Sequence, residues 1–162
     1  MEFLLMKVVE TGNLEQLKSL IKAGVDLSVS DELGRTPLML ACYKGHLPVV
    51  SYLTENAAYK KLWKKEQVDA WMWASIGGRV PVLQYLLEAG VNVDAIDDEN
   101  MTALMYACQE NQFEAVTFLV AAGADVNAGF WNKRCDWVSG LYLANLYGWQ
   151  DIADFLRQKG AW

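Results

Sequence analysis

The sequence has little of the residue types that most often supply catalytic and metal-binding chemistry. Of its 162 residues only one is histidine, His46, and three are cysteines without CxxC spacing, Cys42, Cys108 and Cys135. Zinc sites need closely spaced histidine and cysteine ligands, and disulfide frameworks use paired cysteines in an oxidising compartment. The sequence therefore predicts no metal, no cofactor and no disulfide, and it favours a reducing compartment.

Long apolar runs are also absent. A membrane-spanning helix needs roughly 18 uninterrupted apolar residues, and no segment offers them. The apolar stretch of residues 3–6 lacks the length and the positive flank of a secretory signal. Proline is scarce, with three residues, while 53% of the chain is hydrophobic, which predicts a folded domain rather than a disordered one. We expect a cytoplasmic protein with no membrane partner.

Cationic residues are scarce in one half of the chain. Residues 67–162 carry five Lys or Arg against twelve Asp or Glu, for a net charge of −7. Residues 1–66 carry nine against eight, for +1. Such a field repels nucleic-acid phosphates and attracts a basic protein at moderate salt. The charge therefore argues against nucleic-acid binding and favours a basic protein partner.

No arrangement typical of an active site emerges. His46 follows Gly45 in a turn, where a hydrogen bond to a neighbouring turn's backbone is a simpler role than general-base catalysis. The acidic run 97–99 is typical of a solvated turn tip rather than of a calcium loop or a catalytic pair, and Gly77–Gly78 matches no phosphate-binding loop. We predict that the chain is not an enzyme.

What the sequence does contain is an internal repeat. Shifts of 33 residues, followed by one of 37, align a single column of leucines: Leu20, Leu53, Leu86, Leu119 and Leu156. Self-similarity at such a period indicates stacked supersecondary units, each unable to bury its apolar face alone. Five units are therefore predicted, the last with a four-residue insertion.

Each unit is predicted to contain two helices joined by a turn. Leu83, Leu86 and Leu87 have the i, i+3, i+4 spacing of one helix face. Thr36 followed by Pro37 is typical of an N-cap and a first helical residue. Past the second helices stand glycines, which a left-handed C-cap favours: Gly24, Gly90, Gly123 and Gly160.

The segments Asp31–Leu38 and Gly123–Ala128 closely resemble parts of the ankyrin repeat, and the 33-residue period of the units is also that of the family. The resemblance covers nearly the whole chain and implies an all-α solenoid of stacked antiparallel helix pairs, with short hairpin turns projecting to one side. We expect one domain over residues 1–162, with the first, third and fifth units degenerate. Their approximate bounds are 1–30, 31–63, 64–96, 97–129 and 130–162.

Three units depart further from the pattern. Ahead of the third unit, residues 57–62 are strong helix formers without a turn signature, so we predict a lengthened helix or a helical turn in place of the hairpin. In the fourth unit the segment that leads into the first helix matches the pattern less closely, but its Asn100 can still take the left-handed conformation. The four-residue insertion of the fifth unit falls within residues 129–140, which form the most distinctive loop.

Seven tryptophans are many for this length, and interfaces are enriched in Trp and Tyr. Trp71 shares a column with Leu38 and Leu104, so a core role is predicted. Trp149 and Trp162 are expected to cover the last repeat. Three others fall near predicted turn tips, where burial and partner contact both stay open: Trp63, Trp131 and Trp137.

In the ankyrin family, partners bind the concave face formed by turn tips and first helices. Carried over by register, this resemblance implies partner-binding roles for Tyr43, Lys44, Trp63, Trp73, Ile76, Asp98, Glu99, Met101, Tyr106, Gln109, Glu110, Trp131, Trp137, Leu146 and Tyr147. Further turn-tip candidates are Glu32, Leu33, Arg35, Lys65 and Glu66.

The implied function is a non-catalytic protein–protein interaction module, acting as an adaptor or scaffold. The alternative is an inhibitor or immunity protein that neutralises a basic toxin or nuclease by occluding its active site. The sequence leaves both roles open, together with the partner's identity and the oligomeric state.

Overall fold

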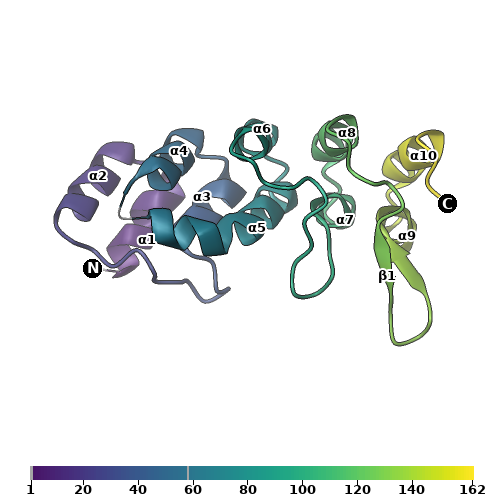
Figure 1. The fold of residues 1–162 in the computed structure, drawn as a ribbon, viewed down its shortest axis with the longest axis horizontal. Helices are drawn as coiled ribbons and strands as arrows, with labels where there is room; N and C mark the ends of the chain where they lie inside the picture. Colours follow the sequence, from purple (N-terminus) through teal and green to yellow (C-terminus); the bar gives the residue numbers. More distant parts are fainter. Residues whose placement is uncertain (1, 58) are drawn as a thin grey trace.

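The structure of the chain is a computed structural model that describes residues 2–57 and 59–162 (Figure 1). Ala58 and the side chains of Lys61, Lys64 and Lys65 lie outside the described residues. The helices and strands are α1 Glu2–Thr11, α2 Leu14–Lys22, α3 Pro37–Lys44, α4 Leu47–Glu55, α5 Lys60–Ile76, α6 Val80–Glu88, α7 Ala103–Gln109, α8 Phe113–Ala121, β1 Gly129–Trp131, β2 Trp137–Ser139, α9 Gly140–Tyr147 and α10 Gln150–Gln158.

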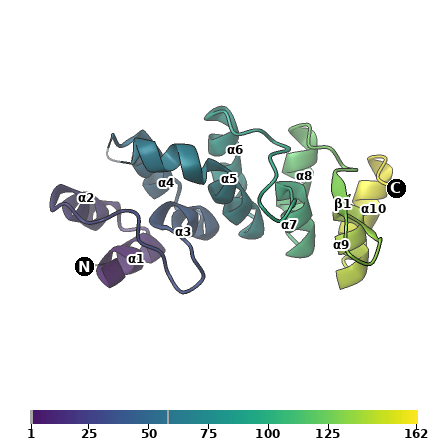
Figure 2. The ribbon, with the colours of Figure 1, turned by 60° about the horizontal axis from the view of Figure 1, so that its bottom comes forward.

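Over this described part, the ten helices follow one another as five pairs. The first helix of each pair lies in one layer and the second in the other, and the turns project on the side of the first helices (Figures 1 and 2). We call the exposed sides of α1, α3, α5, α7 and α9, together with the turns at 25–36 and 91–102 and the β1–β2 hairpin, the turn-side surface. This arrangement confirms the predicted all-α solenoid.

The main apolar core runs between the two layers, and a smaller apolar cluster lies around Met101 and Val138. The predicted leucine column is fully buried at Leu53, Leu86, Leu119 and Leu156, and Trp71 is fully buried as expected. Cys42 and Cys108 are free thiols in the same core. Burial raises the pKa of the Cys108 thiol to about 12, so this thiol stays protonated and acts as a packing group.

The predicted caps are present. Thr36 Oγ1 accepts a hydrogen bond from Met39 N, and Pro37 opens α3. Asn100 has a φ of 62°, which confirms the left-handed conformation expected of it. The four C-cap glycines all have positive φ: Gly24, Gly90, Gly123 and Gly160.

One side-chain hydrogen bond links every pair to the next. His46 Nε2 lies 2.8 Å from the Glu10 carbonyl oxygen, which confirms the backbone contact predicted for this histidine. The bond recurs with other donors at the later junctions: Arg79 Nε to Tyr43 O, Gln112 Nε2 to Ile76 O and Trp149 Nε1 to Gln109 O. The accepting residues follow the 33-residue period, so the repeat extends to the contacts between units.

Helix α5 departs from the other first helices. It has 17 residues, which confirms the lengthened helix predicted in place of a hairpin. Glu66 on its second turn is only 8% exposed, and its Oε2 accepts hydrogen bonds from Thr36 Oγ1 (2.8 Å) and from the buried Tyr59 hydroxyl. The expectation that Glu66 lies at an exposed turn tip is therefore wrong, because no turn forms there.

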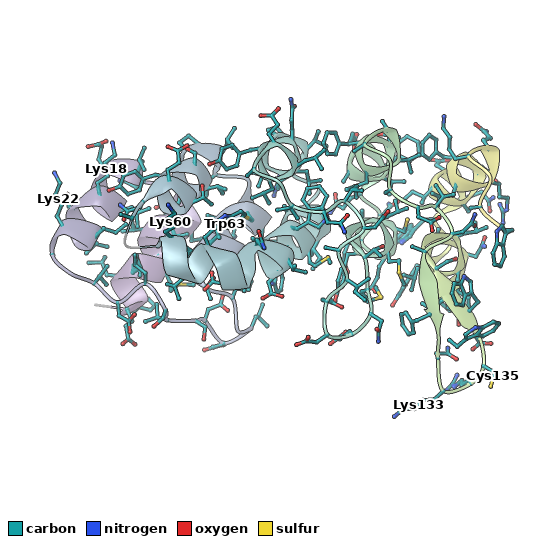
Figure 3. The ribbon with its side chains drawn as sticks, in the orientation of Figure 1. Lys18, Lys22, Lys60, Trp63, Lys133 and Cys135 are labelled. Atoms are coloured by element: carbon teal, nitrogen blue, oxygen red, sulfur yellow. The ribbon has the colours of Figure 1, made fainter. Side chains whose placement is uncertain are left out.

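The insertion of the fifth unit forms a β-hairpin. Strands β1 and β2 pair antiparallel, with Gly129 opposite Ser139 and Trp131 opposite Trp137. Lys133 and Cys135 lie at its tip, away from the helices (Figure 3). The expected loop is thus an ordered projection that extends the turn-side surface.

Candidate protein-binding surface

The N-terminal part of the turn-side surface carries two aromatic rings and a guanidinium group. Tyr43 of α3 and Trp73 of α5 meet edge to face, with ring centroids 5.9 Å apart. The guanidinium carbon of Arg35 lies 5.2 Å from the Tyr43 centroid and 5.4 Å from that of Trp73. Such cation–π contacts fix the rings and the cation together.

Lys44 also lies near the Tyr43 ring, and both cations of this cluster, Arg35 and Lys44, already have anionic partners. Arg35 Nη2 lies 2.7 Å from Asp31 Oδ2, and Lys44 Nζ lies 3.1 Å from Glu10 Oε1. Little cationic charge is therefore left for a partner here. The predicted residues Tyr43, Lys44 and Trp73 thus come together as an ordered, mainly aromatic surface.

The middle of the surface is acidic and is organised around Tyr106. The Tyr106 hydroxyl donates a 2.7 Å hydrogen bond to Asp97 Oδ2, and Asp97 Oδ1 accepts from the backbone N–H groups of Glu99 and Met101. Burial, followed by the Asp97 carboxylate, raises the pKa of Tyr106 well above its usual range. The ring is therefore held as a neutral phenol beside the exposed Asp98 and Glu99.

Asp69 of α5 adds a carboxylate that the sequence interpretation missed. Partial burial raises its pKa, and the charges of Asp97, Asp98 and Glu66 raise it further. A sequence signal did exist, because Asp69 stands one 33-residue period after the N-cap Thr36. Since α5 continues through this position, Asp69 has no helix start to cap.

The acidic groups of this region lack cations. Within the described part of the chain, no lysine or arginine forms a salt bridge with any of Asp69, Asp98, Glu99 and Glu110. Glu110 accepts a hydrogen bond of 3.3 Å from the Gln109 amide. Among the described residues, the repulsion of Asp69 by Asp97 and Asp98 is thus not offset by a salt bridge.

The C-terminal part of the surface is aromatic again. Trp131 and Trp137 on the two strands have ring centroids 5.3 Å apart, and Trp162 stacks on Trp137 with centroids 6.5 Å apart. Trp131 is 68% exposed and Trp162 is 76% exposed, so Trp162 covers little of the last repeat. On the neighbouring α9, Leu146 and Tyr147 are exposed as predicted for a surface column.

Two of the predicted contact residues are wrongly placed by the sequence interpretation. Met101 is only 7% exposed, because Met105, Val138 and Leu143 pack around it. Trp63 lies on the first turn of α5 and packs half-buried against the core, rather than at a turn tip (Figure 3). Ile76 is half-buried, and its carbonyl accepts the bond from Gln112.

Neither a metal centre nor a membrane span is found in residues 2–57 and 59–162. No group of three or more His, Cys, Asp or Glu side chains is placed there to hold a metal ion. None of the helices in this part of the chain is long and apolar enough to cross a membrane.

Comparison with known proteins agrees with the fold. The family model described as "Ankyrin repeats (3 copies)" matches residues 5–97 and 58–129. Protein phosphatase 1 regulatory subunit 27 of Homo sapiens is 45% identical over 54 residues, which are 33% of this chain and 35% of that protein.

Two further relatives match over a similar length. NF-kappa-B inhibitor alpha of Gallus gallus is 48% identical over 48 residues, 30% of this chain and 15% of the relative. Notch-regulated ankyrin repeat-containing protein of Xenopus tropicalis is 42% identical over 48 residues, 30% of this chain and 42% of the relative. The alignments thus span less than half the length of these relatives.

The family match covers most of the chain, and its helices stack in consecutive pairs with the turns on one side. Ankyrin repeats indicate a protein–protein interaction module. On this evidence the chain belongs to the ankyrin repeat family.

Proposed function

We propose that this chain binds a protein partner through its turn-side surface, which corresponds to the concave face of an ankyrin solenoid. The observation that carries the proposal is the ordered aromatic clustering on this surface, around Tyr43 and Trp73 and again around Trp131. Aromatic side chains are frequent binding hot spots, and rings already held by neighbours lose little entropy on association. Tyr106 and Tyr147 supply two further anchors between these clusters.

The charge of the surface favours a basic partner. Arg35 and Lys44 are neutralised within the chain, whereas Glu99 and Glu110 have no cationic partner among the described residues. A lysine or arginine of a partner would supply these exposed acids with a cationic partner. Such complementarity raises the association rate and makes binding sensitive to salt.

Two roles follow from binding of this kind. The first is an adaptor or scaffold that joins several proteins. The second is an inhibitor that occludes the active site of a basic enzyme such as a toxin or nuclease, and two relatives named as a regulatory subunit and an inhibitor support it. Subnanomolar affinity for one salt-sensitive partner would support inhibition, whereas micromolar affinity for several would support the adaptor.

The test is quantitative affinity capture from the source cells at low and high salt. The site variant combines Glu110→Ala, Trp131→Ala and Tyr147→Ala, three exposed positions of the turn-side surface. The matched control combines Glu114→Ala with Phe113→Ala on α8, in the other layer. We expect a basic protein to be retained by the control and lost by the site variant, with unchanged circular dichroism. Equal retention by both variants would contradict the proposal.

A further inference from the structure

Helix α1 is open on two sides. A groove of about 560 Å³ separates it from the turn at 25–36, and Met6, Val29 and Leu40 contribute apolar lining. A second groove, of about 400 Å³, lies between α1 and α2 and is lined in part by Val8 and Leu20. Within the described chain α1 packs mainly on α2 and α3, and both grooves open to solvent.

Large apolar side chains stand at the edges of these grooves. Phe3, beside the larger groove, is 81% exposed, and Leu4, beside the smaller one, is 51% exposed. The opposite end of the solenoid differs, because the exposed side of α10 is polar: Gln150, Asp151, Asp154 and Arg157. On α1 these two apolar side chains stand among the charged Glu2, Lys7 and Glu10, which are exposed as well.

Charge favours a second copy of the chain as the occupant of this end. Residues 2–22 carry three glutamates and three lysines, for a net charge of zero, whereas residues 67–162 carry −7. Contact between two N-terminal ends therefore joins neutral surfaces and keeps the two acidic halves far apart. Any contact through the C-terminal halves would bring like charges together.

The charges on α1 are also self-complementary. In the described structure neither Glu2 nor Lys7 has an ion-pair partner, whereas Glu10 is engaged by Lys44. In a two-fold interface residue i of one copy meets residue j of the other, and j meets i. If two α1 helices cross antiparallel about an axis beside residues 4 and 5, residue 2 of each copy lies opposite residue 7 of the other.

We propose that the chain forms a two-fold homodimer through antiparallel α1 helices. In this dimer Glu2 pairs with Lys7 of the second copy, and Phe3 packs over Met6 in the second copy's larger groove. The surface around Tyr106 and Trp131 stays outside this interface. Arg35 and the turn at 25–36 line the larger groove, so the dimer leaves each copy the middle and C-terminal parts of its proposed partner-binding surface.

The first test is the molar mass in solution, measured by sedimentation over micromolar to millimolar concentrations. Phe3→Glu would place a carboxylate in each of the two apolar contacts, and we expect it to give a monomer. Leu146→Glu is the control, because Leu146 is an exposed apolar residue on the distant α9. A wild-type chain that stays monomeric throughout would overturn the proposal, and so would a dimer lost with Leu146→Glu but kept with Phe3→Glu.

Charge reversal tests the pairing without introducing a buried carboxylate. Glu2→Lys or Lys7→Glu alone would each convert two ion pairs into like-charge contacts and weaken dimerisation by about tenfold. The double variant Glu2→Lys with Lys7→Glu restores both pairs with opposite polarity, and we expect wild-type dimerisation from it. A double variant that dimerises no better than the single variants would overturn the antiparallel arrangement.

Discussion

At the scale of single residues, the three turns that precede α3, α7 and α9 are closed by the same kind of side chain. Asp31 Oδ1 accepts hydrogen bonds from the N–H groups of Leu33 and Arg35, at 3.0 and 2.9 Å. Asp97 and Asn132 form the same two bonds with the residues two and four positions on. The third residue after each has positive φ: Gly34 at 74°, Asn100 at 62° and Cys135 at 64°.

Cys135 is the least suitable of these three residues for its conformation, which predicts a stabilising substitution. Glycine takes the left-handed conformation without steric cost, and other residues pay about 1 kcal/mol or more for it. We expect Cys135→Gly to raise the free energy of unfolding by about 1 kcal/mol and Tm by about 2 to 4 °C. Thermal unfolding in reducing buffer checks this. Cys135→Ala keeps the strain and should give no gain, so equal Tm values for the two variants would contradict the explanation.

Contacts between neighbouring units could not be predicted residue by residue from the sequence. Register placed Met101 at a turn tip, but register alone does not show that Val138 of the following hairpin packs against it. The bonds between pairs were equally hidden, because four different side chains form them. The exception is His46, whose position after a turn glycine sufficed. Repeat periodicity thus predicts where a residue lies along the stack better than what covers it.

At the scale of secondary-structure elements, α5 shows how the fold continues where a hairpin is missing. Helix formers in residues 57–62 were enough to predict that a lengthened helix or a helical turn replaces the hairpin, and the structure has the lengthened helix. They could not predict that Glu66 is buried, because its hydroxyl donors Thr36 and Tyr59 come from outside α5. This carboxylate ties α5 to the start of α3, beside the turn at 25–36.

The contribution of this tie can be measured by substitution. Glu66→Leu leaves the hydroxyl groups of Thr36 and Tyr59 without their acceptor, and each unsatisfied buried group costs about 1 to 3 kcal/mol. We expect Glu66→Leu to lower the free energy of unfolding by about 2 to 4 kcal/mol, and Tyr59→Phe, which removes one bond, to lower it by about 1 kcal/mol. Urea unfolding followed by circular dichroism provides the measurement.

The control for this prediction is Glu88→Leu, at the exposed C-terminal end of α6. An exposed substitution away from such a network usually changes stability by about 0.5 kcal/mol or less. If Glu66→Leu proved as mild as Glu88→Leu, the buried hydrogen bonds would not be what holds α5 in place.

At the scale of the whole molecule, the solenoid separates charge along its length while its core stays continuous. The zero net charge of the N-terminal helix pair, the acidic C-terminal half and the order of the stack follow directly from the sequence. The aromatic clusters could not be predicted in this way, because Trp73, Trp131 and Trp162 lie far apart in the sequence and meet their neighbours through packing. Stability in such a stack is approximately a sum of terms for each repeat and for each interface between neighbours.

That additivity predicts a gradient of local stability. Leu53 is fully buried in α4, whose neighbours are α2, α3, α5 and α6, and Leu53→Ala leaves a cavity worth about 2 to 5 kcal/mol. Because α4 does not pack on the last pair, we expect amide hydrogen exchange to accelerate most in α3 to α6 and least in α9 and α10. Leu119→Ala in α8 is the mirror-image control, with acceleration greatest in α7 to α10 and least in α1 and α2. Mass spectrometry of exchanged peptides resolves these segments, and uniform acceleration in both variants would mean that the stack unfolds as one cooperative unit rather than pair by pair.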